Sequence, residues 1–341
     1  MSVLYITGSK SGAGKTAFAT GLAKILADSG HSVAIIKPIK LPPPENQSAN
    51  DADTQFFLKH FNHEASNQIY PLIVNQESIK NKSLPKEIAK AIAPIDRNNE
   101  FVLVEGLDGI TLNDPISELS AEIAAELNAQ IIIMTQYESS LVELDVKDAT
   151  QLFGSSLLGI IVNRVWRNRN HWVTYDLIPT IERQSIRVIG VIPEDRRMLA
   201  PSVNNIATHL SGKLLTSRPE IERPVDYIMT GGWYLDQGAY VLSRRNNKAV
   251  VVRGDRPDLQ MAALTTSTSC LILTEGKNPI QYITYHAEQE QIPILITEDS
   301  TLATMEQLNT LDNQVTIHND WKATRFAELI KDCCSLNLIL P

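Results

Sequence analysis

The sequence predicts an α/β protein, with a doubly wound parallel sheet in a first domain and a second, smaller α/β domain after it. Short apolar runs alternate with segments of helical periodicity, which is the pattern of strand–helix repeats. The apolar runs are nearly continuous in Val, Ile and Leu, as expected for strands covered on both faces. The length of 341 residues suits two domains of ordinary size.

The elements expected in the first domain follow one another from the N-terminus. Apolar runs predict strands at Val3–Thr7, Val33–Ile36, Phe101–Val104, Ile131–Met134, Gly159–Val162 and Val188–Val191. Helical spacing predicts helices over Lys15–Ser29, Ile116–Leu127 and Leu141–Leu152. The polar, proline-rich stretch 41–50 follows a strand, and ligands of open parallel sheets bind at the carboxyl ends of strands. We therefore expect that loop to border a site.

The pattern changes after about residue 200, where a second domain is expected. We place the first domain at 1–210, a polar linker with two prolines at 211–224, the second domain at 225–320 and a C-terminal helix and tail at 321–341. Strands are expected at Tyr227–Met229, Ala249–Val252, Cys270–Thr274 and Ile294–Thr297, with helices over Asp258–Leu264 and Pro279–Glu290. The tail ends in apolar residues that suit packing against a neighbouring surface or a partner.

Composition argues against several classes of protein. The net charge of −8 disfavours general nucleic-acid binding, which needs Lys and Arg to displace counterions. No apolar run approaches the roughly 20 residues of a membrane-spanning helix, and the N-terminus lacks the basic region of a signal peptide. Cys270, Cys333 and Cys334 show neither a disulfide framework nor zinc spacing. We expect a cytoplasmic protein without nucleic-acid or membrane partners.

The strongest motif is GSKSGAGKT, from Gly8 to Thr16, which follows an expected strand and opens an expected helix. Small residues let backbone N–H groups surround phosphates, and the helix N-terminus adds a favourable dipole. In a P-loop of this kind, Lys15 reaches the β- and γ-phosphates and Thr16 coordinates Mg²⁺. The residues expected to bind the nucleotide here are Gly12, Ala13, Gly14, Lys15, Thr16 and Ala17.

The loop departs from the usual spacing, since Ser9 stands at the first glycine position and Lys10 adds a second, upstream lysine. In this form it resembles the P-loop class that contains dethiobiotin synthetase, cobyrinic acid a,c-diamide synthase and the cell-division ATPases. The resemblance implies that Lys10 reaches across a homodimer interface to the partner's nucleotide. The alternative is a glycine-rich turn with surface lysines, which the strand–turn–helix context disfavours.

The resemblance to dethiobiotin synthetase continues over about the first 200 residues. Lys37 begins a Lys-Pro-Ile motif similar to one whose lysine contacts phosphate and substrate. Asp53 stands where the family has a Mg²⁺-binding aspartate, with Asp51 as an alternative, and helix capping explains either aspartate equally well. Glu105 matches the Mg²⁺ ligand in the family's Val-Glu-Gly motif, at the end of an apolar strand.

Two later strand ends resemble the part of this family that binds the base. Asn163 matches an asparagine that recognises adenine, a role that suits an amide because it both donates and accepts hydrogen bonds. A polar turn residue is the alternative at this position. Pro193 belongs to a stretch similar to the one that flanks the base.

The chain departs from dethiobiotin synthetases at the substrate. Those enzymes usually carry acidic residues inside the phosphate loop, where this chain has Lys10 and Gly12. Their substrate motif after the Lys-Pro pair is replaced by the stretch 40–44, which reads KLPPP. If the chain transfers a phosphoryl group, the acceptor is therefore expected to differ.

Two motifs of the second domain, Met229–Gly232 and Arg253–Asp258, resemble the DRTGG domain in their order and spacing. That domain occurs with a dethiobiotin-synthetase-like domain in the N-terminal regulatory region of some long bacterial phosphotransacetylases. We do not find their acetyltransferase part here, so acetyl transfer is not expected. The charged side chains of the second motif suit a small anionic ligand or a protein partner. An internal ion-pair network, with Asp258 capping the next helix, is the simpler interpretation.

Three functions follow as alternatives. The first is a regulatory or sensing ATPase that binds Mg-ATP, with GTP as a second possibility, and hydrolyses it slowly while Lys10 and Lys15 stabilise charge. The second is an ATP-dependent carboxylate–amine ligase or carboxylase with Lys37 at the acceptor site. The third is a non-catalytic nucleotide-binding module. The missing substrate residues and the resemblance to a regulatory region favour the first.

Overall fold

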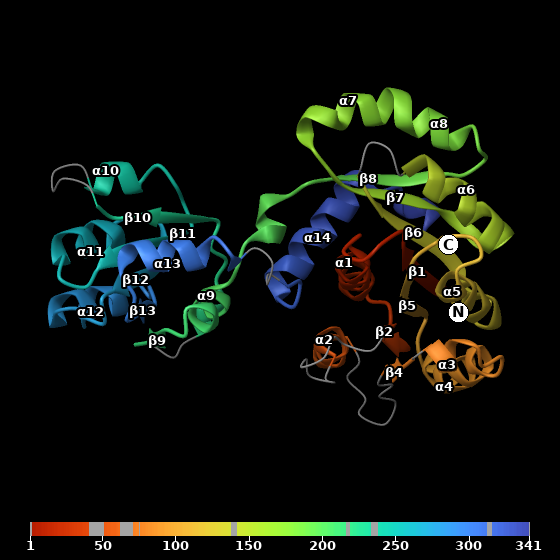
Figure 1. The fold of residues 1–341 in the computed structure, drawn as a ribbon, viewed down its shortest axis with the longest axis horizontal. Coiled ribbons are helices and arrows are strands. Elements are labelled where there is room, and N and C mark those ends of the chain that lie inside the picture. Colours follow the sequence, from red (N-terminus) through yellow and green to blue (C-terminus); the bar gives the residue numbers. More distant parts are fainter. Residues whose placement is uncertain are drawn as a thin grey trace. The chain divides into compact units, whose positions relative to one another are not determined.

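The computed structural model describes residues 2–40, 51–61, 71–74, 76–137, 142–215, 219–232, 238–311 and 316–340 (Figure 1). The expected loop at 41–50 lies outside these residues. The chain divides into two compact units, residues 1–195 with 320–341 and residues 196–319. This division differs from the expected boundary at residue 210, because α9 (Val203–His209) contributes to a core of the second unit. The stretch expected as a linker carries β9 (Lys213–Leu214) and a short 3₁₀ turn (Pro219–Glu222).

The first unit is built on a parallel sheet. Among the described residues its order is β2-β5-β1-β6-β7-β8, and every neighbouring pair runs parallel. These strands are β1 (Ser2–Gly8), β2 (Val33–Ile36), β5 (Phe101–Asp108), β6 (Gln130–Gln136), β7 (Leu157–Val165) and β8 (Val188–Pro193). After β1, the chain first forms β2 and β5 on one side of β1 and later forms β6, β7 and β8 on the other side. The strand order therefore reverses at β1. The predicted doubly wound fold is confirmed, and this reversal places the crevice at the carboxyl end of β1.

Helices cover both faces of this sheet (Figure 1). One face is covered by α1 (Lys15–Asp28) and α14 (Asp320–Cys333), which pack on each other. The other face shares one apolar core with α4 (Leu84–Asn98), α5 (Pro115–Glu126), α6 (Val142–Phe153) and α8 (Ile178–Glu182). Shorter elements are β3 (Ile39–Lys40), α2 (Ala52–His60), β4 (Leu72–Ile73), α3 (Gln76–Ile79) and α7 (Asn170–Trp172).

The C-terminal helix returns to the first unit because a glycine on α1 lets it approach closely. A Cβ at Gly21 would lie 3.0 Å from Ile330 Cδ1 and 3.1 Å from the backbone nitrogen of Ala327. Ile330 is fully buried, and Cys334 forms an antiparallel bridge with Gly190 in β8. The segment expected as a C-terminal helix and tail is therefore part of the core of the first unit, beside the helix that follows the phosphate loop.

The second unit is a smaller sheet with helices on both faces. Its order among described residues is β10-β11-β12-β13-β9, parallel except for β9. The strands are β10 (Tyr227–Thr230), β11 (Lys248–Arg253), β12 (Thr268–Thr274) and β13 (Ile294–Ile296). One core involves α10 (Gly238–Leu242), α11 (Pro257–Leu264) and α12 (Gln281–Gln289), and the other involves α9 and α13 (Thr301–Leu308). Within the described ranges, neither unit contains a helix that is long and apolar enough to cross a membrane.

Candidate nucleotide-binding site

The loop between β1 and α1 has the backbone geometry of a phosphate cradle. Gly12 and Gly14 adopt positive φ angles of 79° and 103°, which glycine tolerates and other residues rarely do. Gly14 is the N-cap of α1, where no side chain from the described part of the chain caps the helix and no acidic residue lies in the first turn. The N–H groups of that turn are thus left to an anionic ligand.

Lys15 is buried and forms an ion pair with Asp108 at the end of β5. The sequence interpretation missed Asp108. Parallel pairing of β1 with β5 sets Gly8 opposite Asp108, so the carboxylate comes directly beside the loop. Its position at a strand end three residues after Glu105 is the signal that could have identified it.

Thr16 and Glu105 meet at the start of α1, where the Thr16 hydroxyl donates to Glu105 Oε1 over 2.9 Å. Only 4% of Glu105 is exposed, and its second carboxylate oxygen is buried and has no hydrogen-bond partner among the residues that the structure describes. Burial raises the pKa of Glu105 to about 7, and the negative charge of Asp53 adds to this effect. The positive charges of Lys37 and Lys15 act in the opposite direction. Among the described residues, Glu105 is therefore a buried carboxylate with one oxygen that no hydrogen-bond donor reaches.

Lys37 and the two candidate aspartates lie together at the end of β2. The Lys37 ammonium donates to Asp51 over 3.1 Å and also pairs with Asp53. Burial disfavours its charged form, but the carboxylates of Glu105 and Asp53 outweigh this and leave the pKa of Lys37 above its usual value. Asp51 also caps α2 by accepting from the backbone nitrogen of Thr54 over 2.9 Å. Asp51 thus both caps α2 and pairs with Lys37, and the negative charge of Asp53 raises the pKa of Glu105.

Asn163 lies against the phosphate loop from the end of β7. Its side-chain nitrogen donates to the carbonyl oxygen of Ala13 over 2.9 Å, and its oxygen accepts from the backbone nitrogen of Arg164 over 2.9 Å. A Cβ at Gly14 would come within 2.2 Å of the same amide, so glycine is needed there for this approach. Pro193 ends β8 and is half-buried.

The remaining expected residues are all in the loop or the first turn of α1. Ala13 is fully buried, and its backbone nitrogen donates to the carbonyl oxygen of Lys10 over 3.3 Å. Gly12 is exposed, and the side chains of Lys10 and Ala17 are half-buried. In the described part of the chain, no three His, Cys, Asp or Glu side chains are grouped to hold a metal ion.

The charged motif of the second unit forms its own ion pairs. Arg253 donates twice to Asp255, over 3.0 and 2.7 Å, and Lys277 also donates to Asp255 over 2.8 Å. These donors hold the pKa of Asp255 well below its usual range. Arg256 pairs in the same way with Asp258, which lies inside the first turn of α11, while Arg256 itself is the N-cap. The expected capping role of Asp258 is thus replaced by an ion pair.

Comparison with known protein families divides the chain near the boundary between the two compact units. The AAA domain family matches residues 2–202, and the DRTGG domain matches residues 205–311. The phosphate acetyltransferase of Nitratidesulfovibrio vulgaris is 26% identical over 354 residues, which covers 94% of this chain and 48% of that protein. The chain thus spans about half the length of this relative.

Two further similarities each cover about half of the chain. The ATP-dependent dethiobiotin synthetase of Corynebacterium efficiens is 28% identical over 169 residues, which covers 47% of this chain and 75% of the synthetase. The MinC:MinD cell division protein complex of Aquifex aeolicus contains a chain that is 19% identical, with a TM-score of 0.39 and coverage of 58% of this chain and 84% of that one. Since the match at 2–202 takes in more than half of the sequence, the chain belongs to the AAA domain family, and its AAA domain is followed by a DRTGG domain.

Proposed function

We propose that the first unit binds Mg-ATP at the loop between β1 and α1 and that the chain acts as a regulatory or sensing ATPase. The observation that carries this proposal is the meeting of Lys15, Thr16 and Glu105 beside the uncapped N-terminus of α1. A lysine and free N–H groups suit phosphate oxygens, and a carboxylate next to a hydroxyl suits a hard cation.

The residues present fit a bound Mg²⁺. Glu105 has a buried oxygen without a partner, and the hydroxyl oxygen of Thr16 lies 2.9 Å from its other oxygen. These two residues would hold the ion, with Asp53 adding negative charge nearby. When bound, Mg²⁺ would neutralise charge that develops on the phosphates. The chain's own part is to donate to the phosphates from Lys15 and from the first turn of α1.

Two similarities support the finer parts of the proposal. The Corynebacterium relative is ATP-dependent by name, which favours ATP as the nucleotide. Similarity to a phosphate acetyltransferase of about twice the length favours a regulatory role. We further propose that Lys10 acts across a homodimer, so Mg-ATP should increase the dimer fraction measured by light scattering in wild type but not in Lys10→Ala.

The test is to measure binding of Mg-ATP and Mg-GTP together with phosphate release. Lys15→Ala should weaken binding about 10- to 100-fold, since it removes charge-assisted hydrogen bonds. The matched control is Lys24→Ala, on the same helix, whose partner is the exposed Asp28. Wild-type affinity in Lys15→Ala, or no nucleotide binding by wild type, would refute the proposal.

Turnover separates this role from its alternatives. Slow phosphate release without any added acceptor supports the regulatory ATPase. Release that requires a small carboxylic acid and an amine would show a ligase instead. Binding with no release under either condition would reduce the role to that of a nucleotide-binding module.

A further inference from the structure

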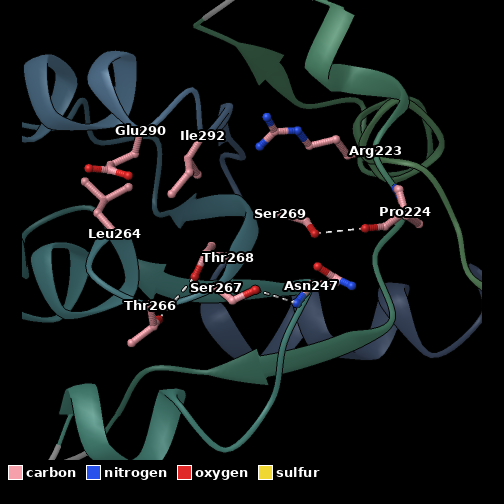
Figure 2. A pocket seen from close by; sticks show the side chains of 10 residues that line it. All are labelled: Arg223, Pro224, Asn247, Leu264, Thr266, Ser267, Thr268, Ser269, Glu290 and Ile292. Atoms are coloured by element: carbon pink, nitrogen blue, oxygen red, sulfur yellow. Dashed lines mark hydrogen bonds between the residues drawn. The ribbon is translucent and has the colours of Figure 1, made fainter.

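The second unit contains a hollow at the amino ends of its strands, at the edge opposite to the Arg253–Asp258 motif (Figure 2). Its volume is about 310 Å³, which lies in the range of small-molecule sites. It is lined by Arg223, Pro224, Asn247, Leu264, Thr266, Ser267, Thr268, Ser269, Glu290 and Ile292. All of these residues belong to one compact unit, so the hollow is a feature of that unit alone.

Two opposite charges line this hollow without neutralising each other. Within the described ranges, the Arg223 guanidinium and the Glu290 carboxylate form no ion pair or side-chain hydrogen bond, either together or with other groups. Figure 2 shows Arg223 beside Pro224 on one side and Glu290 beside Leu264 on the other. A guanidinium only donates hydrogen bonds and an ionised carboxylate only accepts them. The pair thus suits a ligand that carries an anionic group and a cationic group.

The buried hydroxyls of the hollow can only accept further hydrogen bonds. Ser269 is 5% exposed and donates to the carbonyl oxygen of Pro224 over 2.8 Å. Thr268 is 7% exposed and donates to the carbonyl oxygen of Ala263 over 2.7 Å. Since a hydroxyl has one proton, both oxygens have only lone pairs left to offer. They therefore suit N–H donors of a ligand and are poor partners for an anion.

A buried lysine holds the rim of the hollow in place. Lys248 is fully buried and donates to the Thr266 hydroxyl over 2.9 Å and to the carbonyl oxygen of Ser267 over 2.8 Å. The backbone nitrogen of Asn247 also donates to the Ser267 hydroxyl, over 3.2 Å. The segment that carries the lining hydroxyls is thus tied to the start of β11, as expected for a site that exists before its ligand binds.

We propose that this hollow binds a small zwitterion of the amino-acid class, with its carboxylate at Arg223 and its ammonium group at Glu290. The Thr268 hydroxyl accepts from the ammonium group, and the apolar walls at Leu264 and Ile292 contact the side chain of the ligand. A second hollow of about 500 Å³ shares four lining residues with the first, among them Leu264 and Glu290. We expect the side chain of the ligand to extend into this second hollow.

The first experiment compares probes on the full chain by calorimetry. L-Alanine, L-leucine and L-glutamine are the zwitterions, and acetate, methylammonium and inorganic phosphate each supply only one charge sign. At least one amino acid should bind about tenfold or more tightly than every single-charge probe, because only a zwitterion satisfies both side chains. Equal or weaker binding of all three amino acids would overturn the proposal.

Charge-neutral variants then locate the site. Arg223→Gln and Glu290→Gln should each weaken amino-acid binding about tenfold or more. The controls are Arg244→Gln and Glu288→Gln, which change exposed residues of the same unit outside the hollow. The circular dichroism spectrum and the urea denaturation midpoint of each variant should match those of the wild type, which shows that the second unit is still folded. Amino-acid affinity unchanged in both pocket variants would refute the assignment.

Discussion

Lys15 of the phosphate loop and Asp108 at the end of β5 form an ion pair, so the lysine expected to bind phosphate is already held by a carboxylate. The Lys15 side chain is 9% exposed and that of Asp108 is 34% exposed. The pair results from the parallel register that sets Gly8 opposite Asp108. A nucleotide must compete with Asp108 for this lysine and must also approach a fixed negative charge.

Asp108→Asn should therefore raise the affinity for Mg-ATP about two- to fivefold, the range expected for one partly exposed ion pair. Calorimetry of wild type and variant measures this directly. Asp176→Asn, which removes an exposed carboxylate elsewhere in the first unit, should leave the affinity unchanged. Weaker binding by Asp108→Asn would show that Asp108 contributes to the bound state instead.

Asn163→Ala should lower the affinities for Mg-ATP and Mg-GTP together, by about tenfold. The reason is that Asn163 supports the phosphate loop by donating to the carbonyl oxygen of Ala13. Both nucleotides would contact this loop through the same phosphate groups. Parallel binding titrations give the ratio of the two affinities, which should stay constant. A loss confined to ATP would assign adenine recognition to Asn163.

Gly21→Ala should destabilise the protein by about 1–3 kcal/mol, although glycine to alanine in a helix ordinarily stabilises. The added methyl group would crowd Ile330 and the backbone of α14 at 3.0–3.1 Å. Urea denaturation followed by circular dichroism measures the free energy of unfolding.

Ile330→Val provides the matched test, since it removes the Cδ1 atom nearest to the new methyl group. Combined with Gly21→Ala, it should cost less than the sum of the two single changes. If the losses of unfolding free energy in the two single variants simply add in the double variant, the close packing of α1 on α14 at Gly21 is contradicted.

Lys248 gives the free energy of unfolding a pH dependence. Burial lowers its pKa from the ordinary 10.5 to about 8, so the unfolded chain binds the extra proton between these two pH values. The penalty for burying the charge is fully present below pH 8 and disappears as the pH rises toward 10.5. The contribution of this group to stability therefore increases with pH across that window.

Lys248→Met should remove this contribution. Urea denaturation at several pH values between 7.5 and 10.5 should show that the wild type gains stability relative to the variant as the pH rises. A difference between the two proteins that does not change with pH would contradict the assignment.

The local patterns of the first unit were enough to predict its sheet and its phosphate loop. The alternation of apolar runs with helical spacing reports backbone periodicity, which is set within a few residues. The loop from Gly8 to Thr16 is likewise recognisable because its turn, its glycines and its helix start are contiguous. Glu105 was identifiable because it stands at the end of an apolar strand.

Tertiary structure alone decided which distant groups meet. Asp108 reaches Lys15, Gly21 receives α14, and Asn163 supports Ala13 only after strands and helices far apart in the chain have become neighbours. The same holds for Arg223 and Glu290, which line one hollow although β10, β11 and β12 lie between them in the sequence. Local periodicity does not predict such pairings, because they depend on the order of strands in the sheet and on how helices pack against its faces. The sequence by itself determined the parallel strands of the two main sheets and the phosphate loop, and the tertiary structure determined the partners of the charged groups.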